Sequence, residues 1–184
     1  MRKLTMEELN RKSVGEFKVA EKFPVIAILE NIRSAYNVGS VFRTADAFLI
    51  ESVIITGYTA KPPHKEITKT ALGAQDSVDW QYFENTKLAI GHLKKIDYKI
   101  FAVEQVENSI SLEKLNDFSF SKTAFIFGNE VSGVDQEIIS LCDGCVEIPQ
   151  FGMKHSLNIS VAAGIVLWEA VKGIRFPKGR VNKK

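Results

Sequence analysis

The residues best suited to chemistry fall into three short segments, each of which follows or contains the end of an apolar run. The first segment, residues 31–46, carries an asparagine, Asn37, and an arginine, Arg43, within a stretch of helical spacing. Asn37 is a natural helix N-cap. Arg43 lies off the apolar stripe of that helix, so it is not simply a core residue. A capped helix with one surface arginine would produce the same pattern, and this segment alone does not decide between the two interpretations.

The second segment, residues 125–135, is a buried strand followed by a loop with two glycines and a carboxylate, Gly128, Gly133 and Glu130. Glycines at such a place let a ligand approach backbone amides closely. A tight turn with a solvated Glu130 is the alternative. The two glycines do not form the dinucleotide-binding fingerprint, which needs a third glycine and another spacing. This argues against a nucleotide-binding oxidoreductase with a doubly wound sheet.

The third segment, residues 148–160, runs from a strand end through a loop into an almost wholly apolar helix. Ser156 and Asn158 are polar residues at the start of that helix, where backbone amides are free. Capping would account for Ser156, but it explains Asn158 less well. The helical stretch 159–168 leaves almost no polar face, so it requires either a deep position in the fold or a partner chain.

The elements that must position these segments follow from the hydrophobic pattern. Unbroken apolar runs predict strands buried on both faces at 25–29, 53–55, 100–103, 124–127 and 145–148. The alternating run 78–83 predicts an edge strand. Helical spacing predicts helices at 37–48, 86–96, 134–141 and 156–172, and capping-box spacing predicts another at 5–13. Strands that alternate with helices indicate an α/β domain, with a mainly parallel sheet and helices on both faces.

Composition excludes several classes of protein. Hydrophobic residues make up 45% and charged residues 25% of the 184 residues, as in ordinary globular domains. No apolar run approaches the roughly 20 residues of a membrane span, and the N-terminus is too polar for a signal peptide, so we expect a cytoplasmic protein without a membrane partner. Cys142 and Cys145 have redox-motif spacing, but two cysteines and three histidines without ligand spacing predict no metal site.

Charge is uneven along the chain although the net charge is only +2. Residues 172–184 hold six basic residues and no acidic one, which leaves 18 basic and 22 acidic residues, a net charge of −4, in residues 1–171. A basic tail on a mildly acidic body can contact a phosphate backbone. A solvated tail that serves solubility is the alternative.

In order along the chain, the three segments resemble the three motifs of the SpoU/TrmH family, in the SPOUT superfamily of RNA methyltransferases. The matching residues are Asn37 and Arg43 with Thr-Ala-Asp-Ala, then Phe-Gly-Asn-Glu-Val-Ser-Gly, then Ile-Pro with Ser-Leu-Asn-Ile-Ser-Val-Ala-Ala. The resemblance implies a SPOUT-type fold with a deep trefoil knot near the C-terminus, a homodimer, an RNA partner and S-adenosylmethionine as cofactor. It divides the chain into an N-terminal helical extension (1–22), a catalytic domain (23–173) and a basic tail (174–184). We expect no long N-terminal RNA-binding domain of the kind that some members carry.

The resemblance also assigns site residues. The cofactor pocket would be lined by Gly128, Ile148, Gln150 and Leu157, largely through backbone groups. Gln150 stands where relatives often carry an apolar residue, which leaves the role of its side chain open. The positions associated with catalysis and the ribose are Arg43, Asn37, Glu130, Ser156 and Asn158.

The implied reaction is methylation of a ribose 2′-hydroxyl in structured RNA, with transfer RNA favoured over ribosomal RNA. The protein must align the hydroxyl with the methyl group and help its proton leave. Arg43 is either the proton acceptor or, because an arginine pKa lies above about 12, a clamp for the neighbouring phosphate. The alternative function is a non-catalytic RNA-binding protein on the same fold, against which the intact Arg43, Glu130, Ser156 and Asn158 argue.

Overall fold

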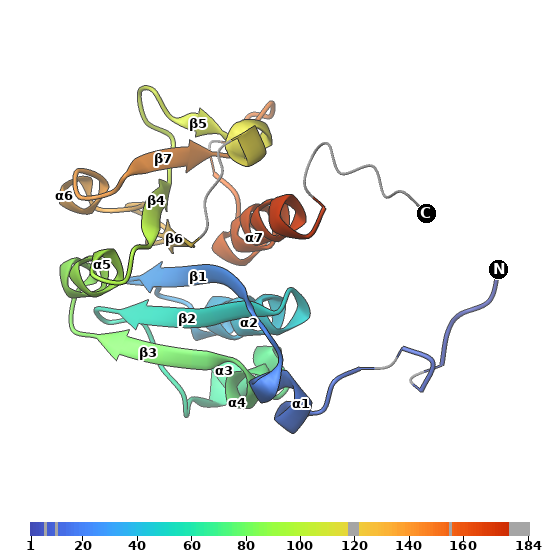
Figure 1. Cartoon of the computed structure of the whole chain (residues 1–184). Helices are drawn as coiled ribbons and strands as arrows, with labels where there is room; N and C mark the ends of the chain where they lie inside the picture. Colours follow the sequence, from blue (N-terminus) through green and yellow to red (C-terminus); the bar gives the residue numbers. More distant parts are fainter. Residues whose placement is uncertain (6, 10, 118–121, 155, 177–184) are drawn as a thin grey trace.

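The computed structural model describes residues 1–5, 7–9, 11–117, 122–154 and 156–176 (Figure 1). In this part of the chain the strands form one seven-stranded sheet in the order β3-β2-β1-β6-β4-β7-β5, and every neighbouring pair is parallel. The strands are β1 (Phe23–Glu30), β2 (Ile50–Thr56), β3 (Asp79–Phe83), β4 (Lys99–Val103), β5 (Ile110–Ser111), β6 (Thr123–Phe127) and β7 (Gly144–Glu147). The predicted parallel α/β sheet is confirmed, and so is the edge position of β3.

Helices cover both faces of this sheet. They are α1 (Val14–Val19), α2 (Ala35–Ala47), α3 (Lys65–Ala71), α4 (Ala74–Ser77), α5 (Thr86–Lys94), the 3₁₀ helix η1 (Leu112–Asp117), α6 (Gln136–Ile139) and α7 (Ile159–Arg175). One core cluster joins β1 to α2, α3 and α7, and a second joins the opposite sheet face to α5 and α6. Because both faces are covered, the central strands are buried along most of their length, which explains their unbroken apolar runs.

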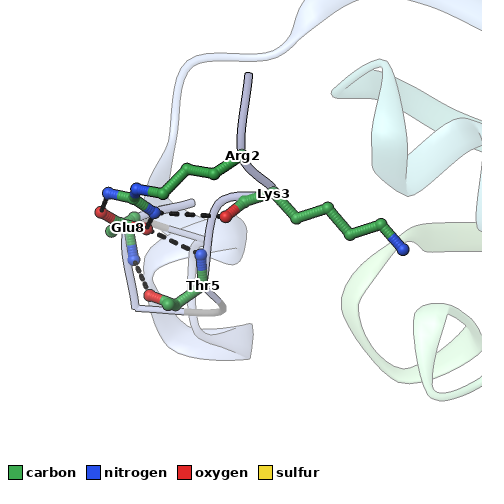
Figure 2. Close-up of polar contacts among 4 residues, drawn as sticks. All are labelled: Arg2, Lys3, Thr5 and Glu8. Carbon is green, nitrogen blue, oxygen red and sulfur yellow. Dashed lines mark hydrogen bonds and ion pairs between the residues drawn. The ribbon is translucent and has the colours of Figure 1, made fainter.

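The predicted helix at 5–13 is wrong, although its capping box forms. The Thr5 amide donates to the Glu8 carboxylate at 2.8 Å and the Glu8 amide donates to the Thr5 hydroxyl at 3.3 Å (Figure 2). Residues 7–9 nevertheless form only a turn, and the first helix, α1, begins at Val14 after a second capping box between Ser13 and Glu16. The described side chains of residues 1–13 are exposed, whereas α1 buries Phe17. A short helix needs such packing, because capping alone does not offset the cost of nucleation.

Helix α7 is buried on one face only. Its inward face packs in the core through Ile159, Ala163, Val166 and Leu167. Its other face is also apolar, yet Val161, Ile165 and Trp168 are 50%, 38% and 45% exposed. A deep position in a single chain is therefore excluded as the explanation of its composition. None of the helices in the described residues is long and apolar enough to cross a membrane.

Close packing of α2 against α3 gives a testable stability difference between two helical glycines. A Cβ at Gly39 would lie 2.1 Å from Thr70 Oγ1 and 2.4 Å from the Ile67 carbonyl oxygen, whereas a Cβ at Gly91 in α5 would meet nothing within 4 Å. We expect Gly39→Ala to lower the free energy of unfolding by about 1–3 kcal/mol through overpacking. Gly91→Ala should raise it by about 0.5–1 kcal/mol, because alanine favours the helix.

Urea unfolding at equal protein concentration measures both effects. The two variants should move the midpoint in opposite directions with the same slope. A shift in the same direction for both would show that helix propensity, not the contact between α2 and α3, controls position 39.

Candidate active site

Glu130 links the loop after β6 to the start of α2. Its carboxylate accepts the Arg33 amide at 2.9 Å, the Ser34 amide at 3.1 Å and the Asn37 side-chain amide at 2.9 Å. A carboxylate at a helix N-terminus satisfies free amides and is favoured by the helix dipole. Burial raises the pKa of Glu130, but the hydrogen bonds from Arg33, Asn37 and Ser34 outweigh it and hold the pKa below its ordinary value. Glu130 is therefore an ionised, fixed anchor.

Asn37 does not cap α2, so that prediction is wrong. The N-cap is Ser34, whose hydroxyl accepts the Asn37 backbone amide at 3.4 Å. The Asn37 side chain is thereby available for another task. It donates to Glu130, as described, and its oxygen accepts the side-chain amide of Asn158 at 3.2 Å.

Asn158, not Ser156, is the N-cap of α7. Its side-chain oxygen accepts the Ser160 amide at 2.9 Å, while its nitrogen reaches Asn37. One hydrogen-bonded line, Glu130–Asn37–Asn158, therefore joins the three segments that the sequence singled out. We call it the amide line.

A second set of bonds fixes the loop beside the amide line. The Asn129 side-chain amide donates to the Asn31 carbonyl at 2.8 Å and to the Tyr58 hydroxyl at 2.6 Å. The Asn129 oxygen accepts the Val131 amide at 2.8 Å. Asn31 and Asn129 lie within the segments that the sequence singled out but were given no role, and Tyr58 was missed. Asn31 directly follows β1, and Tyr58 and Asn129 lie two residues after β2 and β6, where sites in parallel sheets usually occur.

A cavity of about 610 Å³ opens beside the amide line at the carboxyl edge of the sheet. Such a volume is ordinary for a small-molecule site, where roughly 300–1,000 Å³ is typical. Seven of the nine predicted site residues line it: Gly128, Ile148, Gln150, Leu157, Glu130, Ser156 and Asn158. Asn37 does not line it but is bonded to two residues that do. At Gly128 a Cβ would lie 2.3 Å from the Gly133 carbonyl carbon, so the loop around the cavity closes only on glycine.

The cavity wall is acidic. Glu104, Glu130 and Glu147 line it, and the lining holds no lysine or arginine among the described residues. A ligand rich in phosphate would meet repulsion here, whereas a cationic ligand would be attracted. S-adenosylmethionine carries a sulfonium and an ammonium against a single carboxylate. The residues present therefore fit this cofactor.

Glu104 was also missed by the sequence reasoning. It directly follows β4, and its carboxylate accepts the Gln105 amide at 2.8 Å and the Val134 amide at 3.2 Å. Gly133 has a φ of +70°, and a Cβ there would lie 2.2 Å from a Glu104 carboxylate oxygen. Glu104 therefore holds the far end of the loop whose near end is held by Glu130.

Arg43 does not line this cavity. It lies six residues after Asn37 on α2, a rotation of roughly 240° around the helix axis. It lines a different hollow of about 870 Å³, between α2, α3 and α7, together with the exposed apolar residues Val161, Ile165 and Trp168. Within one chain, then, the predicted catalytic set divides into the amide line with Ser156 on one side and Arg43 on the other.

The two cysteines, Cys142 and Cys145, are not joined by a disulfide. Both are free, and burial raises the pKa of Cys142 to about 12, so its thiol stays protonated at neutral pH. In the part of the chain that the structure describes, no cluster of histidine, cysteine, aspartate or glutamate is suited to hold a metal ion.

A parallel α/β sheet with an acidic small-molecule cavity and an amide line at its carboxyl edge defines a class of ligand-binding α/β domain. Comparison with known proteins identifies the family: the SpoU rRNA Methylase family matches residues 24–168. The chain belongs to this family.

The names of individual relatives state two kinds of RNA substrate. The tRNA (guanosine(18)-2′-O)-methyltransferase of Thermus thermophilus is 30% identical over 164 residues, which cover 89% of this chain and 82% of the relative. The 23S rRNA (guanosine-2′-O-)-methyltransferase RlmB of Blochmanniella floridana is 30% identical over 159 residues, which cover 86% of this chain but only 61% of the relative. An AdoMet-bound rRNA methyltransferase from Sinorhizobium meliloti superposes with a TM-score of 0.75 at 26% identity, over 82% of this chain and 56% of that one.

Proposed function

We propose that this chain transfers a methyl group from S-adenosylmethionine to a ribose 2′-hydroxyl of RNA. The observation that carries the proposal is the amide line, Glu130–Asn37–Asn158, at the rim of an acidic cavity in a member of the SpoU family. Relatives named as 2′-O-methyltransferases, and an AdoMet-bound structure of the same fold, support both the reaction and the cofactor.

Bound in the cavity, S-adenosylmethionine supplies a methyl group that is already activated by the sulfonium. Gly128, Ile148 and Leu157 would hold the cofactor, largely through backbone groups, with Gln150 at its edge. Asn158 and Ser156 orient the ribose, and Asn37 with Glu130 keeps Asn158 in place. These groups contribute by positioning, which is the main requirement when the donor is preactivated.

Arg43 acts on the acceptor side, as base for the 2′-hydroxyl proton or as clamp for the adjacent phosphate. Of the two, the phosphate clamp accords better with an arginine, since its pKa lies above about 12. A guanidinium also binds phosphate oxygens in a bidentate manner and stabilises charge that develops on a nearby oxygen.

Transfer RNA is the preferred substrate in this proposal, because the tRNA-directed relative from Thermus is matched over 82% of its length and the rRNA-directed one over 61%.

We also propose a cytoplasmic homodimer with a C-terminal trefoil knot around the cavity. The exposed apolar face of α7 supports the dimer. The convergence of the segments after β4, β6 and β7 on one cavity supports the knot. The basic tail from residue 177 onward lies outside the described residues, and its contact with RNA stays a prediction.

The decisive experiment incubates the protein with total RNA and labelled S-adenosylmethionine, then maps the modified nucleotide. The expected result is label at one nucleotide of a transfer RNA, in a linkage that resists alkaline hydrolysis because the 2′-hydroxyl is methylated, with the same rate in the presence of a chelator. RNA binding without label would support the non-catalytic alternative. Label on ribosomal RNA alone would overturn the substrate preference, and loss of label with chelator would overturn metal independence.

The acidic wall of the cavity gives a prediction about cofactor selectivity. In Glu104→Gln the single side-chain oxygen can still accept one of the two backbone amides, from Val134 or Gln105, but the negative charge is gone. We expect the Kd for S-adenosylmethionine to rise about tenfold, and that for S-adenosylhomocysteine, which lacks the sulfonium charge, to change much less. Calorimetry with both ligands measures the ratio. An equal rise in the Kd values of both ligands would mean that Glu104 acts only by holding the loop at Gly133 and Val134, and not through its charge.

A further inference from the structure

Two exposed tyrosines and a lysine lie at the ends of β2 and β3, and one of the tyrosines contacts the residue before Glu130; none has a role in the reaction described above. Tyr58 follows β2 and is 64% exposed, Tyr82 lies near the end of β3 and is 40% exposed, and Lys61 is exposed beside them. We call these three residues the aromatic strip. Strands β2 and β3, which carry the strip, lie on the side of β1 away from β6, β4 and β7, whose ends line the cavity (Figure 1).

Tyr58 is held in place by the catalytic loop itself. Its hydroxyl accepts the side-chain amide of Asn129, the residue directly before Glu130, at 2.6 Å. Its backbone amide donates to the Asn31 side-chain oxygen at 3.3 Å. The ring is therefore fixed at both ends although most of its surface faces solvent.

Tyr82 is fixed in the same way from the neighbouring strand. Its hydroxyl donates to the Gly57 carbonyl at 3.1 Å, and the Lys61 ammonium lies 3.8 Å from its ring centre. Gly57 has a φ of +63°, and a Cβ there would lie 1.9 Å from the Asn31 side-chain oxygen. The turn that carries Tyr58 thus requires glycine, and it joins both tyrosines to Asn31.

The chemistry of the strip suits unpaired nucleotides. The exposed Tyr58 ring, with its hydroxyl tethered, offers a flat surface at little entropic cost on binding, because it is already ordered. The Tyr82 ring carries Lys61 over its face and holds that lysine beside Tyr58. Bases that are splayed out of a helix stack on such rings, and a lysine beside them meets the phosphate. Paired bases are already stacked on their neighbours, so a continuous double helix could not use these surfaces.

We propose that the aromatic strip stacks unpaired nucleotides flanking the methylated one, and so selects a loop or single-stranded segment of the RNA. This inference rests on the proposed function, because it needs an RNA whose target ribose lies at the amide line. It adds a substrate class that the cavity and the amide line do not specify.

The test compares Tyr58→Ala and Tyr58→Phe on a hairpin RNA that carries the mapped target nucleotide in its loop. Stacking on an aromatic residue is worth about 1–3 kcal/mol per base, so Tyr58→Ala should raise the KM for the hairpin roughly 5- to 150-fold. Both variants lose the hydroxyl that accepts the Asn129 amide, so their Kd values for S-adenosylmethionine should equal each other. Tyr58→Phe keeps the ring and should stay much closer to wild type. Ile96→Ala, which removes an apolar side chain of 41% exposure from the turn before β4, is the control and should behave as wild type.

A hairpin with abasic flanking positions separates stacking from a structural role. Wild type should bind the abasic hairpin more weakly than the intact one. Tyr58→Ala should bind both hairpins equally, because the ring and the base act as a pair and the variant has already lost the ring. Additive losses, or an unchanged KM in Tyr58→Ala, would overturn the proposal.

Failure of the proposed function would be recognised separately. If wild type methylates no RNA, anisotropy of a fluorescent oligoadenylate still tests the strip, and weaker binding by Tyr58→Ala than by Ile96→Ala supports it. Equal binding of both variants would count against the strip whatever the enzyme does.

Discussion

Glu130→Ala is expected to lower the rate of methylation by about 100-fold or more, with a smaller effect on cofactor binding. The Glu130 carboxylate holds two backbone amides at the start of α2 and the side chain of Asn37. Without it, Asn37 and in turn Asn158 lose their fixed positions. A small misplacement of orienting groups can cost about 100-fold in rate. Single-turnover rates at saturating cofactor, beside calorimetric Kd values, separate the two effects.

Glu130→Gln is the matched control for this prediction. Glutamine keeps one acceptor oxygen but presents an amide nitrogen to a backbone donor. The methylation rate of Glu130→Gln should therefore fall between those of Glu130→Ala and wild type. If Glu130→Ala kept more than half of the wild-type rate, the amide line would not be needed for catalysis.

The pH dependence follows from the lowered pKa of Glu130. Because that pKa lies below its ordinary value of 4.5, the carboxylate stays ionised through neutral and mildly acidic pH. The stability that it contributes is present above the ordinary value and is lost only as the pH falls through the lowered one. The ratio of the Glu130→Gln rate to the wild-type rate should therefore stay constant between about pH 5 and 8. A ratio that changes across this window would show that Glu130 titrates within it.

The sheet and the long helices could be predicted from the sequence because their hydrophobic patterns are continuous. Each central strand is covered on both faces, so burial imposes an unbroken apolar run. Strand β5 has two residues and α4 has four, which is too short for any period to show. Helix α3 was also not predicted as an element of its own.

Capping patterns misled the prediction at the two places where several polar residues compete. Thr5 and Glu8 form their bonds but gain no packing, so a turn results. At α2, Ser34 takes the cap and leaves Asn37 for the site. The motifs located the cavity, and the sequence had already placed Arg43 off the apolar stripe of its helix. The structure adds that this side of α2 faces the hollow shared with α7 and not the cavity.

The position of Arg43 leads to a prediction about two chains. Arg43 shares its hollow with Val161, Ile165 and Trp168 of α7, which are the apolar residues that one chain leaves exposed. In the proposed dimer, packing of these faces would bring Arg43 of one subunit towards the cavity of its partner. Asn158 stays with the cavity of its own chain. Each working site would then combine residues of both subunits.

Arg43→Ala should abolish methylation while it leaves the Kd for S-adenosylmethionine nearly unchanged, since Arg43 does not line the cavity. Asn158→Ala should also be inactive. In a mixed dimer of the two variants, one composite site contains both substitutions and the other contains neither. Random pairing makes half of the dimers mixed, so co-expressed variants should regain up to about a quarter of wild-type activity if the sites act independently. Differently tagged subunits allow the mixed dimer to be purified and its activity measured directly. No recovery in that purified dimer would mean that each chain builds its own site, and Arg43 would then have to reach the cavity of its own chain by a movement of α2.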